Sequence, residues 1–270
     1  MTKYREKKYI CGKYMEVCIY PVFEQMQGKR KRIKQSTAVQ KALNDHNREK
    51  KLTRLMNANF TDEDMKIELT YTDEFLPKTD EDANRELRNF FRRIKRFRKR
   101  EGLPELKYIV ITERGKRSGR YHHHIVMSGG MLLKDVRDTW GKGIIRMTQL
   151  EETERGYAPL ARYLSKKLVA GAIEENEKAW HSSRNLIQPK ELQNDSRISK
   201  KRARSLYENQ ECRDPFENLY PEYDFVECRP IYNEINGQYY LYVYMRKKEK
   251  PKPKRKKVRT EWQTTARVSP

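Results

Sequence analysis

The hydrophobic positions in the middle of the chain follow two different periods. Four short segments alternate polar and apolar residues or concentrate β-branched and aromatic ones, as strands do. They are MKIELTYT at 65–72, LKYIVITE at 106–113, YHHHIVMSGG at 121–130 and GIIRMTQL at 143–150. The second and third are separated by a short segment with two glycines, which predicts an antiparallel hairpin.

Other segments repeat apolar residues every three or four positions, which indicates helices. They span 36–57, with Ser36 or Thr37 as the N-cap, 80–101, 133–140 and 157–172, with Pro159 in the first turn. In the second helix Thr79 is expected to cap the start and Gly102 to end it. Its apolar stripe is expected to belong to the core and consists of Ala83, Leu87, Phe90, Phe91, Ile94 and Phe97.

The two ends of the chain differ from this centre. YMEVCIYPVF at 14–23 predicts a strand, and 224–247 predicts a hairpin with Asn236-Gly237 at its turn. We therefore expect an α+β protein in four parts. These are an N-terminal strand and basic helix (1–59), a core (60–172), a C-terminal extension with a β-hairpin (173–246) and a disordered Lys/Pro-rich tail (247–270).

Charge narrows the function. Lys and Arg number 60 against 38 Asp and Glu, a formal net charge of +22, which indicates a polyanionic partner because bound phosphates release counterions. A solvated basic surface is the alternative, both for the helix at 36–57 and in general. We further propose that Arg92, Arg93, Arg96 and the tail contact phosphates.

Several function classes are not supported by the sequence. No apolar run is long enough for a membrane span or a signal peptide. Four scattered cysteines without a C-x-x-C motif indicate neither a zinc ribbon nor a disulfide framework, so we expect reduced thiols in a cytoplasmic protein. No G-x-x-x-x-G-K-[ST] motif occurs, so we expect any DNA unwinding to need a host helicase.

Three consecutive histidines are the first candidate for chemistry. Residues i and i+2 of a strand point the same way, so His122 and His124 share a face and His123 lies on the other. Glu113 ends the preceding strand, across the hairpin, where its carboxylate could meet both rings. Two imidazoles and one carboxylate suit a divalent cation with positions left for water or a phosphate oxygen. A chance pair of surface histidines is the alternative.

Tyr163 is the second candidate. Lys166 and Lys167 follow at three and four residues, so they meet the phenol on one side of the helix. A phenol is mostly protonated near neutral pH, and it needs nearby positive charge to attack a phosphate. A structural tyrosine is the alternative. Tyr157 is a weaker candidate because it precedes Pro159 and lies nearly one face away.

The segments LTY at 69–71, E-x8-H-x-H at 113–124 and Y-x-x-K at 163–166 occur in this order. Over about residues 60–172 the chain resembles the HUH endonuclease superfamily, specifically the rolling-circle replication initiators of small phages and plasmids. The resemblance implies a central antiparallel sheet flanked by helices (an RRM- or palm-like nuclease). His123 departs from the pattern, because the family usually has a bulky apolar residue there, and we expect it to be a third exposed ring.

The resemblance also assigns roles. His122, His124 and Glu113 match the ligands of a Mg²⁺ or Mn²⁺ ion, Tyr163 matches the nucleophile, and Lys166 matches the lysine of the tyrosine motif. Thr70 and Tyr71 match a first motif, to which the resemblance assigns no definite role.

These matches give a function to test. The expected function is nicking of a single-stranded or hairpin DNA origin, with a 5′-phosphotyrosine adduct and a free 3′-OH that a host polymerase extends. The alternatives are a relaxase or transposase on the same scaffold, a non-catalytic basic DNA-binding protein, and an unrelated zinc hydrolase.

Overall fold

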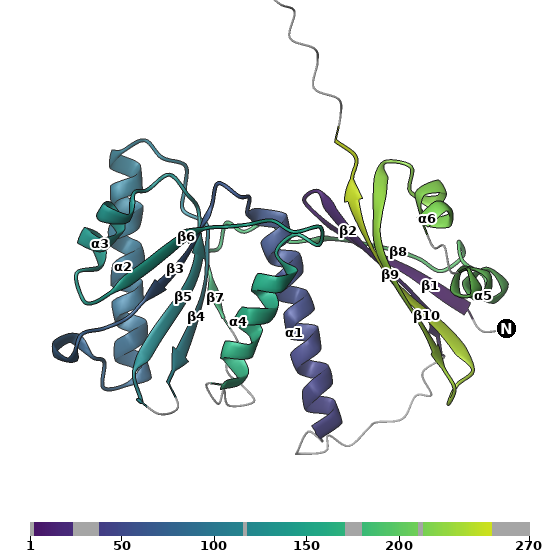
Figure 1. The fold of residues 1–270 in the computed structure, drawn as a ribbon, viewed down its shortest axis with the longest axis horizontal. Helices are drawn as coiled ribbons and strands as arrows, with labels where there is room; N and C mark the ends of the chain where they lie inside the picture. The colour runs from purple at the N-terminus through teal and green to yellow at the C-terminus, as the bar shows by residue number, and fades with distance from the viewer. Residues whose placement is uncertain (1–2, 24–37, 116–117, 171–179, 210–212, 250–270) are drawn as a thin grey trace, which may run out of the picture.

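The computed structural model describes residues 3–23, 38–115, 118–170, 180–209 and 213–249. Within these ranges the chain forms two five-stranded antiparallel sheets and six α-helices. Figure 1 shows the arrangement as layers: α2 and α3, the first sheet, α1 and α4, the second sheet, then α5 and α6. The expected α+β class with a helix-flanked antiparallel sheet is confirmed.

The first sheet, called here the central sheet, has the order β6-β3-β5-β4-β7. All four predicted strands are present, and β4 and β5 form the predicted antiparallel pair. Its strands are β3 (Met65–Leu69), β4 (Tyr108–Arg114), β5 (Tyr121–Met127), β6 (Ile145–Gln149) and β7 (His181–Ser182). Because β5 is the middle strand, its histidines have neighbours on both sides.

Helices cover both faces of the central sheet. A 3-10 turn at Asp73–Phe75, α2 (Asp80–Arg100) and α3 (Leu133–Trp140) lie toward one face. The opposite face is covered by α1 (Ala38–Asn59) and α4 (Ala158–Ala170), whose apolar side chains pack on Ile109, Ile111 and Val126.

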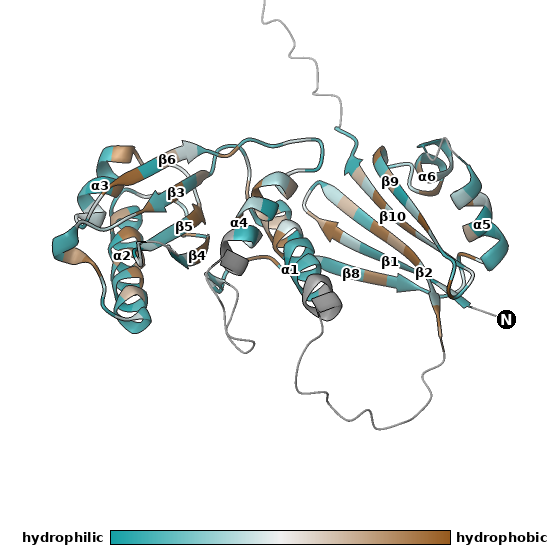
Figure 2. Cartoon of the chain, turned by 60° about the horizontal axis from the view of Figure 1, so that its bottom comes forward, coloured by the Kyte–Doolittle hydropathy of each residue, from teal (hydrophilic) through white to brown (hydrophobic). Residues whose placement is uncertain are grey.

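The α2 prediction holds in detail. The Thr79 side chain accepts a hydrogen bond from the Asp82 amide, and Gly102 follows the helix at φ +67°. Its apolar stripe is buried except for Phe97, which is half-buried, and the helix is otherwise mostly hydrophilic (Figure 2). Arg98 is also buried; its guanidinium donates to the carbonyls of Pro104, Ser128 and Gly129. The proposed caps of α1, Ser36 and Thr37, lie outside the described residues.

The second sheet, called here the terminal sheet, joins the two ends of the chain in the order β8-β1-β2-β10-β9. The C-terminal hairpin is present, with Gly237 at φ +60° in its turn. The N-terminal region forms a hairpin rather than the single strand expected. The elements are β1 (Lys3–Cys11), β2 (Tyr14–Val22), β8 (Lys190–Asn194), α5 (Lys200–Glu208), α6 (Arg213–Leu219), β9 (Tyr223–Asn233) and β10 (Gln238–Lys247).

Two predictions about chemistry concern the whole fold. Cys11, Cys18 and Cys228 are free thiols, whereas Cys212 and the tail beyond residue 249 lie outside the described residues. Burial raises the pKa of the Cys11 and Cys18 thiols to about 12. In the described part of the chain, no helix is both long and apolar enough to span a bilayer.

Candidate active site

The strand β5 presents its histidines to opposite faces of the central sheet. His122 and His124 point toward the layer of α1 and α4, and His123 points into the core under α2 and α3. The strand register sets Glu113 of β4 opposite His122 and Glu68 of β3 opposite His124. One carboxylate therefore flanks the pair of histidines from each side.

These four side chains are associated in pairs. His124 Nε2 lies 3.0 Å from Glu113 Oε2, and His122 Nδ1 lies 3.8 Å from Glu68 Oε1. Glu113 thus reaches His124 diagonally across the two strands. The His124 side chain is 2% exposed but that of His122 is 31% exposed, so the pair runs from the covered interior to the open edge of the sheet. Glu68 was not predicted.

His123 is fully buried, and the expectation of an exposed third ring is wrong. Its Nε2 lies 2.7 Å from the Tyr71 hydroxyl and its Nδ1 lies 2.9 Å from the Thr112 hydroxyl. Burial, followed by the two neighbouring histidines, lowers the pKa of His123 to about 3. Two hydroxyls can satisfy either neutral tautomer, so a polar ring occupies a core position without an unpaired nitrogen.

The start of α4 is fastened to α1, and this sets the position of Tyr163. Asn57 Oδ1 accepts a hydrogen bond of 2.8 Å from the Tyr157 amide, immediately after Gly156 at φ +64°. Two turns later the Tyr163 ring lies perpendicular to the His124 ring, with 6.0 Å between centroids. The fold therefore brings the predicted nucleophile to the predicted histidine pair.

The cation nearest the Tyr163 ring in the described structure is not one of those predicted. Lys66 Nζ, from β3, lies 4.6 Å from the centroid of that ring. Lys166 is exposed on the same helix as Tyr163, one turn further on. The side chain of Lys167 lies outside the described residues. Lys66 and Glu68 both follow from the pairing of β3 with β5, which no local pattern reveals.

The other two tyrosines considered as nucleophiles are buried. The Tyr157 hydroxyl donates to Asp62 at 3.1 Å, and Tyr71 lies against His123. Both side chains are at most 4% exposed, whereas Tyr163 is 39% exposed. Burial, aided in Tyr157 by the Asp62 hydrogen bond, raises the pKa of both phenols. Of these three, Tyr163 alone offers its ring to an incoming strand.

Residues of the first motif support the site from behind. The Thr70 hydroxyl donates to the Ile144 carbonyl at 3.1 Å, and the Thr70 carbonyl accepts from the Trp140 indole at 2.9 Å. Gly143 passes so close that a Cβ there would lie 2.4 Å from the Thr70 oxygen. Thr70 and Tyr71 therefore connect β3 to α3 and to the buried histidine.

The donor atoms fit a divalent cation in kind. Two ligands at about 2.1 Å from one octahedral ion lie about 3 Å apart, close to the 3.0 Å between Glu113 and His124. Among the described residues, no set of three His, Cys, Asp or Glu side chains is already gathered around one point. A metal site here would need His122 or Glu68 to turn toward the other two.

Comparison with known families adds one finding. Residues 64–168 match a family model. The family is that of the replication-associated protein ORF2. The matched segment begins just before β3 and ends within α4, so it contains both exposed-face histidines, both carboxylates and Tyr163. The match is consistent with a replication initiator. No curated protein and no solved structure matches the chain.

Proposed function

We propose that the protein initiates rolling-circle replication by nicking a single-stranded origin, or a hairpin presented as one, through Tyr163. One observation carries the proposal: the half-exposed Tyr163 ring stands 6.0 Å from the His124 ring. Both lie within the segment that matches the replication-associated family. The buried alternatives Tyr71 and Tyr157 lack access to a substrate.

The proposed reaction is a phosphoryl transfer. The Tyr163 oxygen forms a bond to the scissile phosphorus, the bond from phosphorus to the 3′ oxygen breaks, and the phenolic proton is balanced by protonation of that 3′ oxygen. The products are a 5′-phosphotyrosine and a 3′-OH primer. Attack by the 3′-OH on the adduct reverses the step and rejoins the strand.

Residues of this chain would stabilise the charge that develops. Lys66 beside the Tyr163 ring and Lys166 on the same helix place positive charge near the transferred phosphoryl group. A Mg²⁺ or Mn²⁺ ion held by Glu113, His122 and His124, with Glu68 as a further ligand, would polarise the phosphate. A host helicase and polymerase would unwind and extend the DNA.

The competing functions predict different products. A relaxase or transposase would form the same adduct on a different substrate. A zinc hydrolase would release a free phosphate end, and a DNA-binding protein would leave the strand intact.

The decisive experiment incubates the protein with a labelled single-stranded oligonucleotide library and Mn²⁺, then separates the products on a denaturing gel. A denaturation-resistant adduct is expected with the wild type and none with Tyr163→Phe, since this change removes only the hydroxyl. Tyr232→Phe is the matched control because Tyr232 is 44% exposed on the terminal sheet. Adduct from Tyr163→Phe would place the nucleophile elsewhere; no adduct from the wild type would remove the nicking function.

A further inference from the structure

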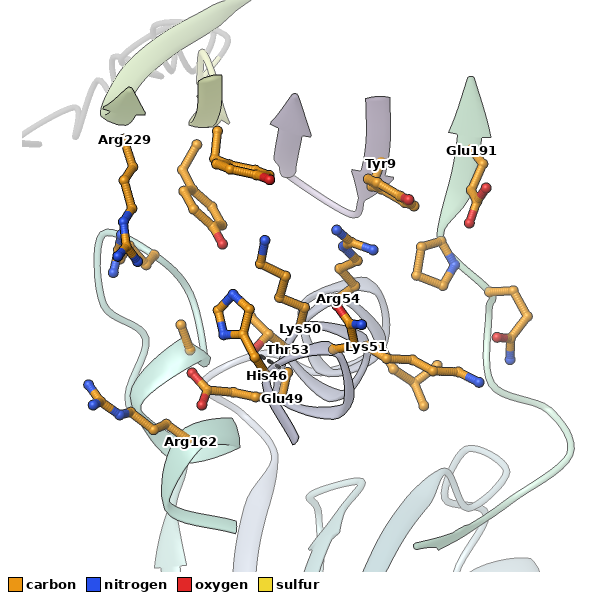
Figure 3. A pocket seen from close by; sticks show the side chains of 18 of the residues that line it. Tyr9, His46, Glu49, Lys50, Lys51, Thr53, Arg54, Arg162, Glu191 and Arg229 are labelled. Atoms are coloured by element: carbon orange, nitrogen blue, oxygen red, sulfur yellow. Dashed lines mark hydrogen bonds between the residues drawn. The ribbon is translucent and has the colours of Figure 1, made fainter. Parts of the chain in front are cut away.

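A cavity of about 1140 Å³ lies between α1 and the terminal sheet, on the other side of α1 and α4 from the histidines. Figure 3 shows α1 end-on, with Lys50 and Arg54 pointing toward the sheet and Tyr9 facing them. Six Lys or Arg side chains and two Glu side chains line it: Lys50, Lys51, Arg54, Arg155, Arg162, Arg229, Glu49 and Glu191. The lining is therefore positive in balance.

Three tyrosine rings of the terminal sheet are already covered by cations. The Arg54 guanidinium lies 3.4 Å from the Tyr9 centroid, and Lys50 Nζ lies 4.3 Å from that of Tyr242. Arg155 likewise lies 5.0 Å from the Tyr244 centroid. Because these cations occupy the ring faces, the cavity is not equipped for stacking nucleobases on the three rings. It presents charge instead.

Part of this charge is balanced from within the protein. Buried Glu16 of β2 pairs with Arg54 at 2.6 Å and with Lys50 at 3.7 Å, so one carboxylate serves two cations. Arg155 pairs with Glu227. At the lining itself, Glu191 pairs with Lys7.

The cations at the rim are not balanced in this way. Lys51, Arg162 and Arg229 are exposed, and none of them forms an ion pair with an acid in the described parts of the chain. Burial lowers the pKa of His46 in the lining, and the charges of Lys50 and Arg229 lower it further. The rim thus holds positive charge that a ligand could neutralise.

We propose that this cavity binds the phosphate backbone of single-stranded nucleic acid, as a second contact apart from the nicking site. Grooves that hold single strands without sequence preference track the backbone with positive charge. On α4, Arg162 borders the cavity and its neighbour Tyr163 faces His124. A strand that leaves the tyrosine can therefore cross α4 to the rim. The identity of that strand as the nicked DNA rests on the proposed function.

The test compares the double variant Arg162→Gln/Arg229→Gln with the control Lys200→Gln/Lys201→Gln. The control removes the same charge from exposed positions of α5, beyond the far face of the terminal sheet. Both are made in the Tyr163→Phe background, so binding is measured without covalent chemistry. Fluorescence anisotropy gives the Kd of a long single-stranded oligonucleotide over a range of salt concentrations.

The cavity variant is expected to bind about tenfold more weakly, with a salt slope smaller by about 0.7 for each lost phosphate contact. The control should lose less than twofold. Equal losses in the two variants, unchanged affinity in the cavity variant, or an equal loss toward duplex DNA would each overturn the proposal. If the wild type forms no adduct but the cavity variant still loses affinity, the nicking function fails and the cavity assignment stands.

Discussion

The two carboxylates that flank His122 and His124 differ in what the sequence reveals about them. Glu113 is close in sequence to its partners through a hairpin, so its approach to His124 could be predicted. Glu68 is far away in sequence and meets His122 only because β3 pairs with β5 in one register. Both carry the same chemistry, and both should contribute to binding a cation if one is used.

Metal dependence is therefore expected to follow the face of the sheet rather than the sequence motif. Chelation should abolish adduct formation, and added Mn²⁺ should restore it. His122→Ala and His124→Ala should remove at least most of the activity, and Glu68→Gln should raise the Mn²⁺ concentration needed for half-maximal rate about 10- to 100-fold. Titration of adduct yield against Mn²⁺ measures this, with His181→Ala as a control on exposed β7. Full activity in the presence of a chelator would contradict the expectation.

Positive charge beside the phenol gives another residue-scale test. Lys66→Met keeps the length of the side chain and removes the ammonium that lies over the Tyr163 ring. Adduct formation should slow by about 10²-fold, since an electrostatic contact to the transition state is lost. Lys166→Met should slow it by about 10² to 10⁴ if that lysine assists directly. Single-turnover rates at saturating DNA distinguish the two; unchanged rates for Lys66→Met would make that contact incidental.

At the scale of elements, the position of α4 depends on one tight junction. A Cβ at Gly156 would lie 2.4 Å from Asn57 Oδ1, the atom that holds the Tyr157 amide. Gly156→Ala should therefore shift the start of α4, lower the free energy of unfolding by more than about 1–2 kcal/mol, and slow adduct formation.

Gly102→Ala is the matched control. Gly102 has φ +67° but nothing within 4 Å of its Cβ position, so it carries the same backbone strain without the clash. Chemical denaturation and the adduct rate are measured for both variants. Equal stability losses with normal adduct formation in each would show that the junction does not position Tyr163.

Most elements near the site could be predicted because their signals are local. The Thr79 cap, the α2 stripe and the β4–β5 hairpin depend on residues a few positions apart, and all three are confirmed. The burial of His123 could not be predicted, because it depends on hydroxyls that Tyr71 and Thr112 bring from two neighbouring strands. Likewise, β1, β7 and β8 carry weak local patterns and are held by their partners.

The position of α2 bears on the predicted phosphate contacts. Arg93 donates to the Thr139 carbonyl at 3.0 Å, whereas Arg92 and Arg96 are exposed. The helix covers the face of the central sheet opposite Tyr163. Phosphates bound there would belong to a different part of the DNA from the scissile one, and the contact stays a prediction.

For the whole molecule, the net charge of +22 predicts strongly salt-dependent binding to DNA. The Lys/Pro-rich tail carries part of this charge outside the described residues. Deleting 250–270 should reduce the slope of log Kd against log salt while adduct formation on short oligonucleotides continues. Anisotropy across a salt series measures the slope. An unchanged slope would mean that the tail makes no phosphate contacts.

The terminal sheet also has a consequence for how the protein is made. Its central strands β2 and β10 pair residues more than 220 positions apart, such as Leu241 with Ile19, so the N-terminal hairpin waits during synthesis for almost the whole chain to emerge. The central sheet has all its strands by residue 182 and can form earlier, since domains fold in the order of their synthesis. A newly made chain would thus complete the nicking face first and the second DNA contact last.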